Sequence, residues 1–346
     1  FHENHNCHEF CRDDPRDFEN APKPPQDWIP DVTILRRMMI QGRDSHGNPW
    51  PPPLDSELCE TIGFDGGRAD DPNGRLIKEA PIKAKPLVPD NGGPKILCMI
   101  YTMEDAHATR IRAIRETWAG GCDGFLAFST ASDPRIPAIS IPHEGKEEYN
   151  NMWQKIRSMW KFVAKHYMED FDFFFIGGDD LYVLPQNLRN YLGSLEGSPD
   201  VTPHFVGRRF KSSSYFYSGG AGYALSRAAL TKFMTVVEDD TCGAHAHTSM
   251  EDVMIAKCLL NILGLKFQDT RDDQDRERFH PFAPGGHLTW KPPKKGGYDW
   301  YEAYNKEWGV KLGTECCAPD SVSFHYMKKQ AMVRHVHALL YNCPKE

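Results

Sequence analysis

The sequence lacks a surplus of basic residues and a long apolar run. Its 346 residues carry a formal net charge of −7. This balance argues against a nucleic-acid binder, because such proteins normally present a basic face. No stretch reaches the roughly 18 apolar residues of a membrane span. The chain starts at Phe1, and we expect a membrane anchor to precede it in the full-length protein.

The sequence also lacks a Cys-x-x-Cys pair, although it contains ten cysteines, at positions 7, 11, 59, 98, 122, 242, 258, 316, 317 and 343. A four-thiolate zinc site is therefore disfavoured. Disulfides formed in an oxidising compartment are the preferred interpretation, and buried free thiols are the alternative. The sequence does not determine the pairing. It also contains no Asn-x-Ser/Thr site that would support a secretory location.

A His/Cys cluster at the N-terminus could bind zinc, and it consists of His2, His5, Cys7, His8 and Cys11. A Cys7–Cys11 bridge, or separate bridges to the rest of the chain, is the preferred interpretation in an oxidising compartment.

Composition divides the chain near residue 94. Residues 1–94 are rich in Pro, Gly, Asp and Asn, which predicts a stem or wrapping region with at most one helix, near Val32–Met39. Residues 95–346 form the predicted catalytic domain. Strands are predicted at Lys95–Tyr101, Gly124–Ser129 and Phe171–Ile176, and helices at Ala106–Trp118, Lys146–Met168, Arg227–Val237, Met250–Leu263 and Lys328–Tyr341. This alternation favours an α/β fold with a largely parallel sheet flanked by helices.

The third predicted strand leads directly into Gly177-Gly178-Asp179-Asp180. In an open α/β sheet, ligands bind just beyond the carboxyl ends of the strands. Carboxylates in that position can hold a divalent cation, and the cation can hold a diphosphate. A solvated Asp-Asp turn is the simpler alternative.

Six blocks in order, between Lys95 and Tyr341, resemble the core 1 β1,3-galactosyltransferases of the Fringe-like β1,3-glycosyltransferase family. The blocks are Arg112–Trp118, Asp179–Val183, Phe205–Phe210, Ser218–Tyr223, Glu251–Val253, and Cys316-Cys317 with Val322–Tyr326. The resemblance implies a Rossmann-like GT-A fold. It also implies inverting transfer of galactose from UDP-galactose, in β1,3 linkage, to a GalNAc attached to Ser or Thr. A Mn²⁺ cofactor and a type II membrane protein of the Golgi lumen are further expectations, and a homodimer is considered.

The same resemblance assigns roles to individual residues. Asp180 and His325 are expected to bind the metal, and Asp252 is expected to be the general base. The expected donor-binding residues are Asp179, Arg112, Arg115, Gly220 and Tyr326. The expected acceptor-binding residues are Arg208, Arg209, Gly219 and Trp300.

Each role has a simpler structural alternative. A lone histidine at a strand end is often structural, and acidic residues at a helix start complement the helix dipole. The arginines at 112 and 115 could form surface salt bridges, the glycines could form a plain turn, and Trp300 could pack in the core.

Gly178 departs from the resemblance, because the related sequences often carry three consecutive aspartates where this chain has Gly178-Asp179-Asp180. The usual role of the first aspartate, near the nucleotide ribose and the metal, is therefore open. Two alternatives remain for the function. One is a related β1,3-glycosyltransferase that uses another UDP-sugar, and the other is a non-catalytic, chaperone-like homologue.

Overall fold

The computed structural model describes residues 28–32, 35, 71–86, 92–133, 136–295 and 297–342. The N-terminal His/Cys cluster lies outside these ranges, as does most of the segment predicted to be helical near Val32–Met39.

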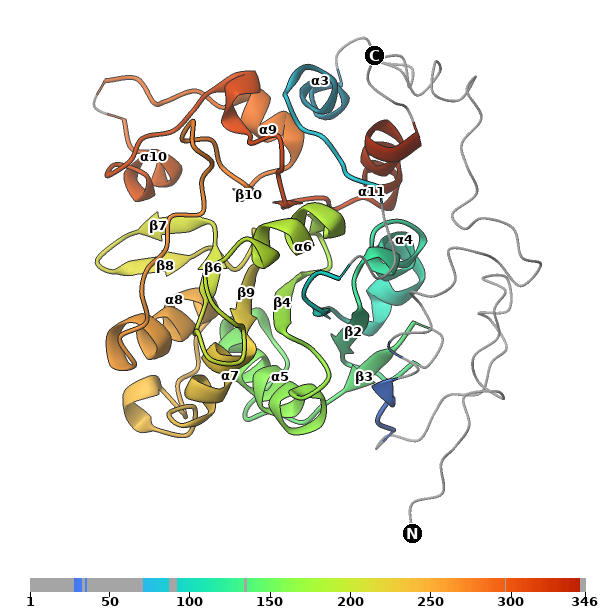
Figure 1. The fold of residues 1–346 in the computed structure, drawn as a ribbon, viewed down its shortest axis with the longest axis vertical. Coiled ribbons are helices and arrows are strands. Elements are labelled where there is room, and N and C mark those ends of the chain that lie inside the picture. The colour runs from blue at the N-terminus through green and yellow to red at the C-terminus, as the bar shows by residue number, and fades with distance from the viewer. Residues whose placement is uncertain are drawn as a thin grey trace, which may run out of the picture.

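Within the described ranges, six strands form a central sheet in the order β3-β2-β1-β4-β9-β6 (Figure 1). The four strands at one side are parallel: β3 (Ala138–Ser140), β2 (Gly124–Ser129), β1 (Ile96–Tyr101) and β4 (Phe173–Gly178). β9 (Tyr223–Ser226) runs antiparallel to both β4 and β6 (Phe205–Gly207). The prediction of a mainly parallel sheet is confirmed.

Helices cover both faces of this sheet. One face packs against α5 (Met152–Tyr167) and α7 (Arg227–Met234). The predicted apolar stripe of α5 is buried, because Trp153, Ile156, Trp160, Val163 and Tyr167 recur at helical spacing. The other face packs against α4 (Arg112–Glu116) and α6 (Pro185–Gly193), and α11 (Gln330–His337) packs against α4.

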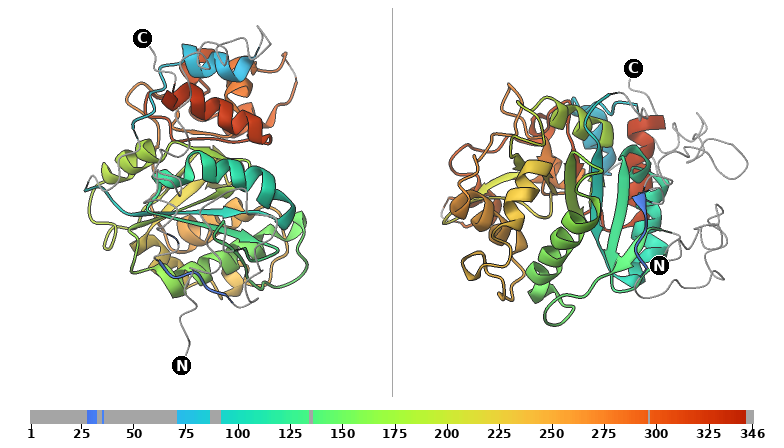
Figure 2. Two further views of the ribbon diagram at one scale, coloured as in Figure 1. Left: turned by 90° about the vertical axis from the view of Figure 1, so that its right-hand side faces the viewer. Right: turned by 60° about the horizontal axis from the view of Figure 1, so that its bottom comes forward.

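Part of the N-terminal region packs into the hydrophobic core on the α4 and α6 side of the sheet. Asp71 caps α3 (Pro72–Glu79) by accepting from the backbone N–H groups of Asn73 and Gly74. Leu76 and Ile77 of α3 are fully buried. α3 contacts α9 (Pro284–Thr289) and α11, and Figure 2 shows α3 and α11 side by side at the top of its left view. The domain boundary at residue 94 stays a prediction.

Three strands of two residues each form a second, smaller sheet. β10 (Phe279–His280) pairs in parallel with β11 (Ser323–Phe324), and β11 pairs antiparallel with β5 (Tyr182–Val183). This sheet joins the segment after β4 to the C-terminal part of the chain. A separate hairpin consists of β7 (Arg209–Lys211) and β8 (Tyr215–Tyr217). α8 (Glu251–Ala256) and α10 (Trp300–Tyr304) are two further short α-helices.

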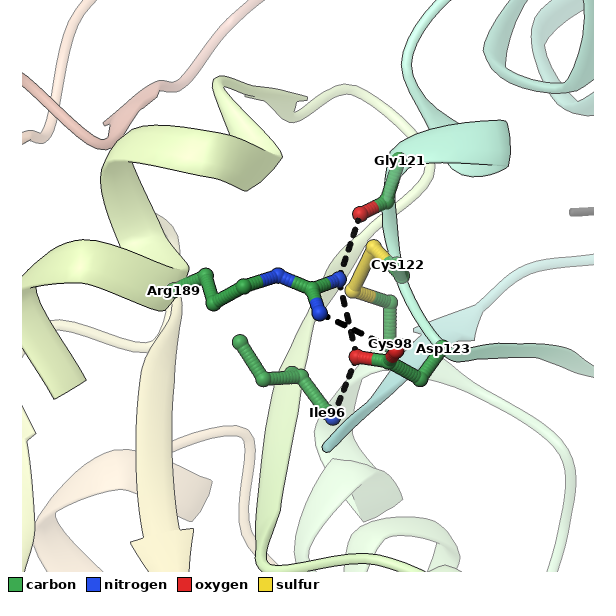
Figure 3. Close-up of a disulfide and its surroundings, with 6 residues drawn as sticks. All are labelled: Ile96, Cys98, Gly121, Cys122, Asp123 and Arg189. Carbon is green, nitrogen blue, oxygen red and sulfur yellow. Dashed lines mark hydrogen bonds and ion pairs between the residues drawn. A yellow bond between two sulfur atoms is a disulfide. The ribbon is translucent and has the colours of Figure 1, made fainter. Parts of the chain in front are cut away.

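Three disulfides confirm the prediction of disulfides over free thiols for the described cysteines: Cys98–Cys122, Cys242–Cys258 and Cys316–Cys317. Figure 3 shows the first of them, which joins β1 to the residues before β2. Beside it, Asp123 accepts from the backbone N–H of Ile96 at 2.9 Å and pairs with Arg189 at 2.9 Å. This end of the sheet is therefore fixed covalently and by an ion pair from α6.

None of the helices in the described ranges is long and apolar enough to cross a membrane.

Candidate active site

Asp180 and His325 meet because the small sheet brings two distant segments together. Asp180 is the second residue after β4 and lies two residues before β5, and His325 directly follows β11, the partner strand of β5. The Asp180 carbonyl accepts a hydrogen bond from the N–H of Met327 at 2.8 Å. The Asp180 Oδ1 and His325 Nε2 atoms are consequently 3.3 Å apart.

This pair fits two neighbouring ligands of a Mn²⁺ ion. Two cis ligands of an octahedral ion, each about 2.1 Å from the metal, lie about 3 Å from one another. The Pro281 carbonyl lies 3.3 Å from His325 Nδ1. A hydrogen bond there leaves Nε2 free to bind a metal. Among the described residues, no group of three or more His, Cys, Asp or Glu side chains could hold a metal alone. Diphosphate or water oxygens would therefore complete the coordination.

Asp179 lies beside the pair but is held by other groups. Its Oδ2 accepts from the Thr102 hydroxyl at 2.6 Å, and its Oδ1 lies 2.8 Å from Arg110 Nε. Burial raises the pKa of Asp179, although the Thr102 hydrogen bond and the Arg110 charge oppose the shift. The guanidinium of Arg110 therefore lies at the carboxyl end of the sheet, beside the candidate metal pair.

The sequence motif selects Arg112 and Arg115 for donor binding and does not single out Arg110. Arg112 forms an ion pair with Glu116 at 2.8 Å, and Glu116 is also bound by Arg334 of α11. Arg115 lies on α4. Successive helical residues point about 100° apart, so three arginines at positions 110, 112 and 115 face different directions. The sequence contains no signal that indicates which one faces the sheet end.

Asp252 lies in the first turn of α8, where backbone groups hold its carboxylate. Its Oδ2 accepts from the N–H of Gly219 and its Oδ1 from the N–H of Val253, each at 2.9 Å. Burial raises the pKa of Asp252, and these hydrogen bonds oppose the rise. Asp252 as a whole residue is nevertheless only partly buried.

The neighbouring Glu251 differs from Asp252 in its surroundings. It is buried, and it accepts from the Tyr223 hydroxyl at 2.9 Å. Burial, followed by the charge of Asp252, raises the pKa of Glu251 well above its usual value. Burial thus raises the pKa of both adjacent carboxyl groups, and it raises that of Glu251 further. Asp252 is the better candidate for accepting a proton, because two backbone N–H groups favour its ionised form.

A glycine strip, residues 218–222, lies between the base and the metal pair. A Cβ added to Gly219 would overlap the Glu251 carboxylate and come within 3.3 Å of the Asp252 Cβ. A Cβ added to Gly220 would overlap the His325 ring. Two consecutive residues, with Cα atoms about 3.8 Å apart, therefore contact the base and the candidate metal ligand.

The two arginines predicted to bind the acceptor both have partners within the protein. Arg208 is fully buried and forms an ion pair with Glu277. It also donates to the Tyr301 hydroxyl at 3.1 Å and to Asn305 Oδ1 at 2.6 Å. Arg209 pairs with Asp269 at 3.0 Å and lies over the Trp308 ring. Arg208 thus holds α10, the helix that begins with Trp300.

A row of aromatic rings runs from Trp300 to the metal pair. Trp300 keeps 37% of its surface exposed. Its ring contacts Phe282, which in turn stacks on Tyr326, and Tyr326 stacks on His325 with 4.0 Å between centroids. Tyr326 has a positive φ of 57° and is 41% exposed. An open aromatic surface therefore lies next to the candidate metal ligand.

Comparison with known proteins gives one family and several relatives that are named as transferases or synthases. A model of the Fringe-like family matches residues 93–280. The chain is 35% identical over 242 residues to glycoprotein-N-acetylgalactosamine 3-beta-galactosyltransferase 1 of Xenopus laevis, which covers 69% of this chain and 64% of that protein. It is 24% identical over 200 residues to mouse chondroitin sulfate synthase 3, covering 51% of this chain and 22% of the relative. It is 26% identical over 176 residues to human chondroitin sulfate glucuronyltransferase, covering 49% and 22%.

A mainly parallel sheet with carboxylates at its carboxyl end defines an α/β protein of the GT-A type, as predicted. The chain belongs to the Fringe-like family. It spans less than two thirds of the length of each of these relatives.

Proposed function

We propose that the protein is an inverting β1,3-galactosyltransferase that transfers galactose from UDP-galactose to a GalNAc acceptor. The observation that carries the proposal is the glycine strip between Asp252 and the Asp180–His325 pair. The reaction needs a base for the acceptor hydroxyl and a charge partner for the leaving diphosphate. The match to the Xenopus galactosyltransferase supports the choice of donor and acceptor.

In this proposal Asp252 accepts the proton of the acceptor hydroxyl. The acceptor oxygen forms a bond to the anomeric carbon while the bond from that carbon to the diphosphate breaks, and UDP leaves. A base on one side of the sugar and a leaving group on the other give inversion, by the geometric logic of inverting glycosidases. An α-linked donor sugar thereby becomes β-linked in the product.

Asp180 and His325 would hold a Mn²⁺ ion, and a bound ion there would neutralise the charge of the diphosphate. Asp179 and Arg110 lie next to this pair and would position the donor. Gly220 leaves the space that His325 occupies, and Tyr326 would contact the donor from the side of His325. Arg112 and Arg115 stay predictions for donor binding.

For the acceptor, Trp300 would provide a stacking surface for the apolar face of a sugar. Gly219 would let the acceptor approach the base. Arg208 and Arg209 would act indirectly, since both side chains are engaged by protein groups. A Golgi location is part of the proposal and is supported by the resemblance and the disulfides. A type II membrane anchor and a homodimer are also part of it and rest on the resemblance alone.

The direct test measures UDP release from UDP-galactose with a GalNAc-α-O-peptide, in the presence of Mn²⁺ or of EDTA. We expect acceptor-dependent turnover that EDTA abolishes. A parallel screen of other UDP-sugars separates this activity from that of a related transferase. Absence of turnover with every donor, together with absence of UDP binding, would favour the chaperone-like alternative.

The two glycines allow the roles of base and metal pair to be separated. Gly219→Ala inserts a methyl group against Glu251 and Asp252, so we expect kcat to fall by roughly tenfold or more with Mn²⁺ affinity retained. Gly220→Ala inserts a methyl group against His325, so we expect a weaker apparent Mn²⁺ affinity. Steady-state kinetics across a Mn²⁺ titration measures both quantities. Each variant is the control for the other, and identical effects in both would contradict this division of roles.

A further inference from the structure

Tyr101 lies directly beside the position where the chain departs from the family resemblance. It is the last residue of β1, and Gly178 is the last residue of β4. The two are register partners in the parallel pairing of these strands. Paired residues of neighbouring strands project from the same face of a sheet. A side chain at position 178 would therefore emerge next to the Tyr101 ring.

The Tyr101 ring leaves little room for such a side chain. A Cβ at position 178 would lie 3.1 Å from Cε2 and 3.2 Å from Cζ of Tyr101, and 3.1 Å from Oδ1 of Asp180. Ordinary van der Waals contact between carbon atoms begins at about 3.5 Å. A side chain at position 178 would therefore require the Tyr101 ring to shift by a few tenths of an ångström. The phenol ring crowds the position from which the missing side chain would emerge.

The surroundings of the Tyr101 phenol are rich in acidic groups. The charges of Glu251, Asp180, Asp252 and Asp179 all act on it. The residue is partly exposed. Within the described part of the chain, no hydrogen bond to the Tyr101 hydroxyl is found. A tyrosine hydroxyl both donates and accepts hydrogen bonds, so this group can serve a ligand.

The charge pattern selects the kind of ligand group. A phosphate at this hydroxyl would be repelled by the surrounding carboxylates. The groups that suit a phosphate are Arg110 and a metal ion held by Asp180 and His325. A neutral sugar hydroxyl suits the position, because it can accept from the phenol and donate to a neighbouring carboxylate.

We propose that Tyr101 replaces the absent acidic side chain at position 178 as a donor-binding residue, with its hydroxyl bound to a sugar hydroxyl of the nucleotide-sugar donor. That hydroxyl belongs either to the ribose or to the transferred hexose. The inference rests on the proposed function. It makes the change at position 178 an exchange of one polar group for another.

Calorimetric titration of Tyr101→Phe with UDP and with UDP-galactose, in Mn²⁺ and without acceptor, tests the hydroxyl. This substitution keeps the ring and removes the hydroxyl. We expect the dissociation constant to rise about threefold to tenfold. A rise for both ligands assigns the contact to the ribose, and a rise for UDP-galactose alone assigns it to the hexose. Unchanged affinity for both would overturn the inference.

Tyr167→Phe is the matched control, because its hydroxyl donates to the Pro30 carbonyl at the far end of α5. We expect that variant to lower the melting temperature without changing UDP affinity. If the wild-type protein binds neither ligand, the proposed function fails and the inference with it. If the wild type binds both and Tyr101→Phe binds equally well, only the inference fails.

Three variants test whether the Tyr101 ring and a side chain at position 178 compete for the same space: Gly178→Asp, Tyr101→Ala and the double variant. We expect the double variant to bind UDP more tightly than either single variant, because the new carboxylate then has room. Neighbouring residues that share a space show such non-additive effects. Strictly additive changes in the UDP dissociation constant would contradict the exchange.

Discussion

Replacing Asp252 with asparagine is expected to lower kcat by about 10²- to 10⁴-fold, the usual contribution of a general base. The amide cannot accept the proton of the acceptor hydroxyl. It can still accept one of the two backbone hydrogen bonds that hold the carboxylate now. We therefore expect the free energy of unfolding to change by about 1 kcal/mol or less. Single-turnover kinetics and thermal unfolding measure the two effects separately.

The pH dependence of the reaction should reflect the same residue. The base acts when ionised, so kcat/KM falls as the pH drops through the pKa of Asp252. Because burial raises that pKa, the acidic limb should lie above the ordinary aspartate value of about 3.9. The raised pKa also means that ionised Asp252 lowers stability as the pH rises through it. Asp252→Asn should therefore lose both the acidic limb and this stability cost.

Glu251→Gln identifies which of the two adjacent carboxyl groups is the base. Glu251 is buried and its pKa is raised well above the usual value, so an amide is a close replacement for its protonated form. We expect this variant to lose less than about tenfold in kcat, far less than Asp252→Asn. A larger loss in Glu251→Gln than in Asp252→Asn would reverse the assignment.

Asp180→Asn is expected to reduce kcat/KM by about 10²-fold or more, because an amide holds a divalent ion and its bound diphosphate less well than a carboxylate. UDP affinity in the presence of Mn²⁺ should fall in parallel, while binding in EDTA should be the same as for the wild type. Calorimetry with and without Mn²⁺ measures this difference.

Asp172→Asn is the matched control for the metal pair. Asp172 directly precedes β4, at the end opposite to Asp180, and pairs with Arg227 at 3.2 Å. Its loss should affect stability but not the Mn²⁺ dependence. Equal Mn²⁺ responses in Asp180→Asn and the wild type would show that the ion, if used, binds elsewhere.

The sequence was sufficient to predict the main strands and the long helix, because their signals are local. β1 and β2 lie within one residue of their predicted bounds, and the buried stripe of α5 was visible in its aromatic spacing. The two-residue strands β5 and β11 were not predicted, since so short a segment has no periodicity of its own. They form because the fold brings their segments together.

The candidate site was predictable where sequence motifs mark its residues. Asp180, His325 and Asp252 were found through motifs, and the structure brings Asp180 and His325 together. Arg110 was missed because the direction of a helical side chain depends on where the helix lies. The burial of Arg208 was missed for a similar reason, since its partner Glu277 is 69 positions away in the printed sequence. Such pairings are set by tertiary structure and leave no local pattern.

The packing of α3 has a consequence for the synthesis of the chain. α3, near residue 75, contacts α9 and α11, which follow more than 200 residues later. β5 likewise cannot pair until β11 has been synthesised. Domains begin to fold as the chain leaves the ribosome, but these contacts cannot form until nearly all of the described residues have emerged. The central sheet can assemble early, whereas Asp180 meets His325 only near the end of translation.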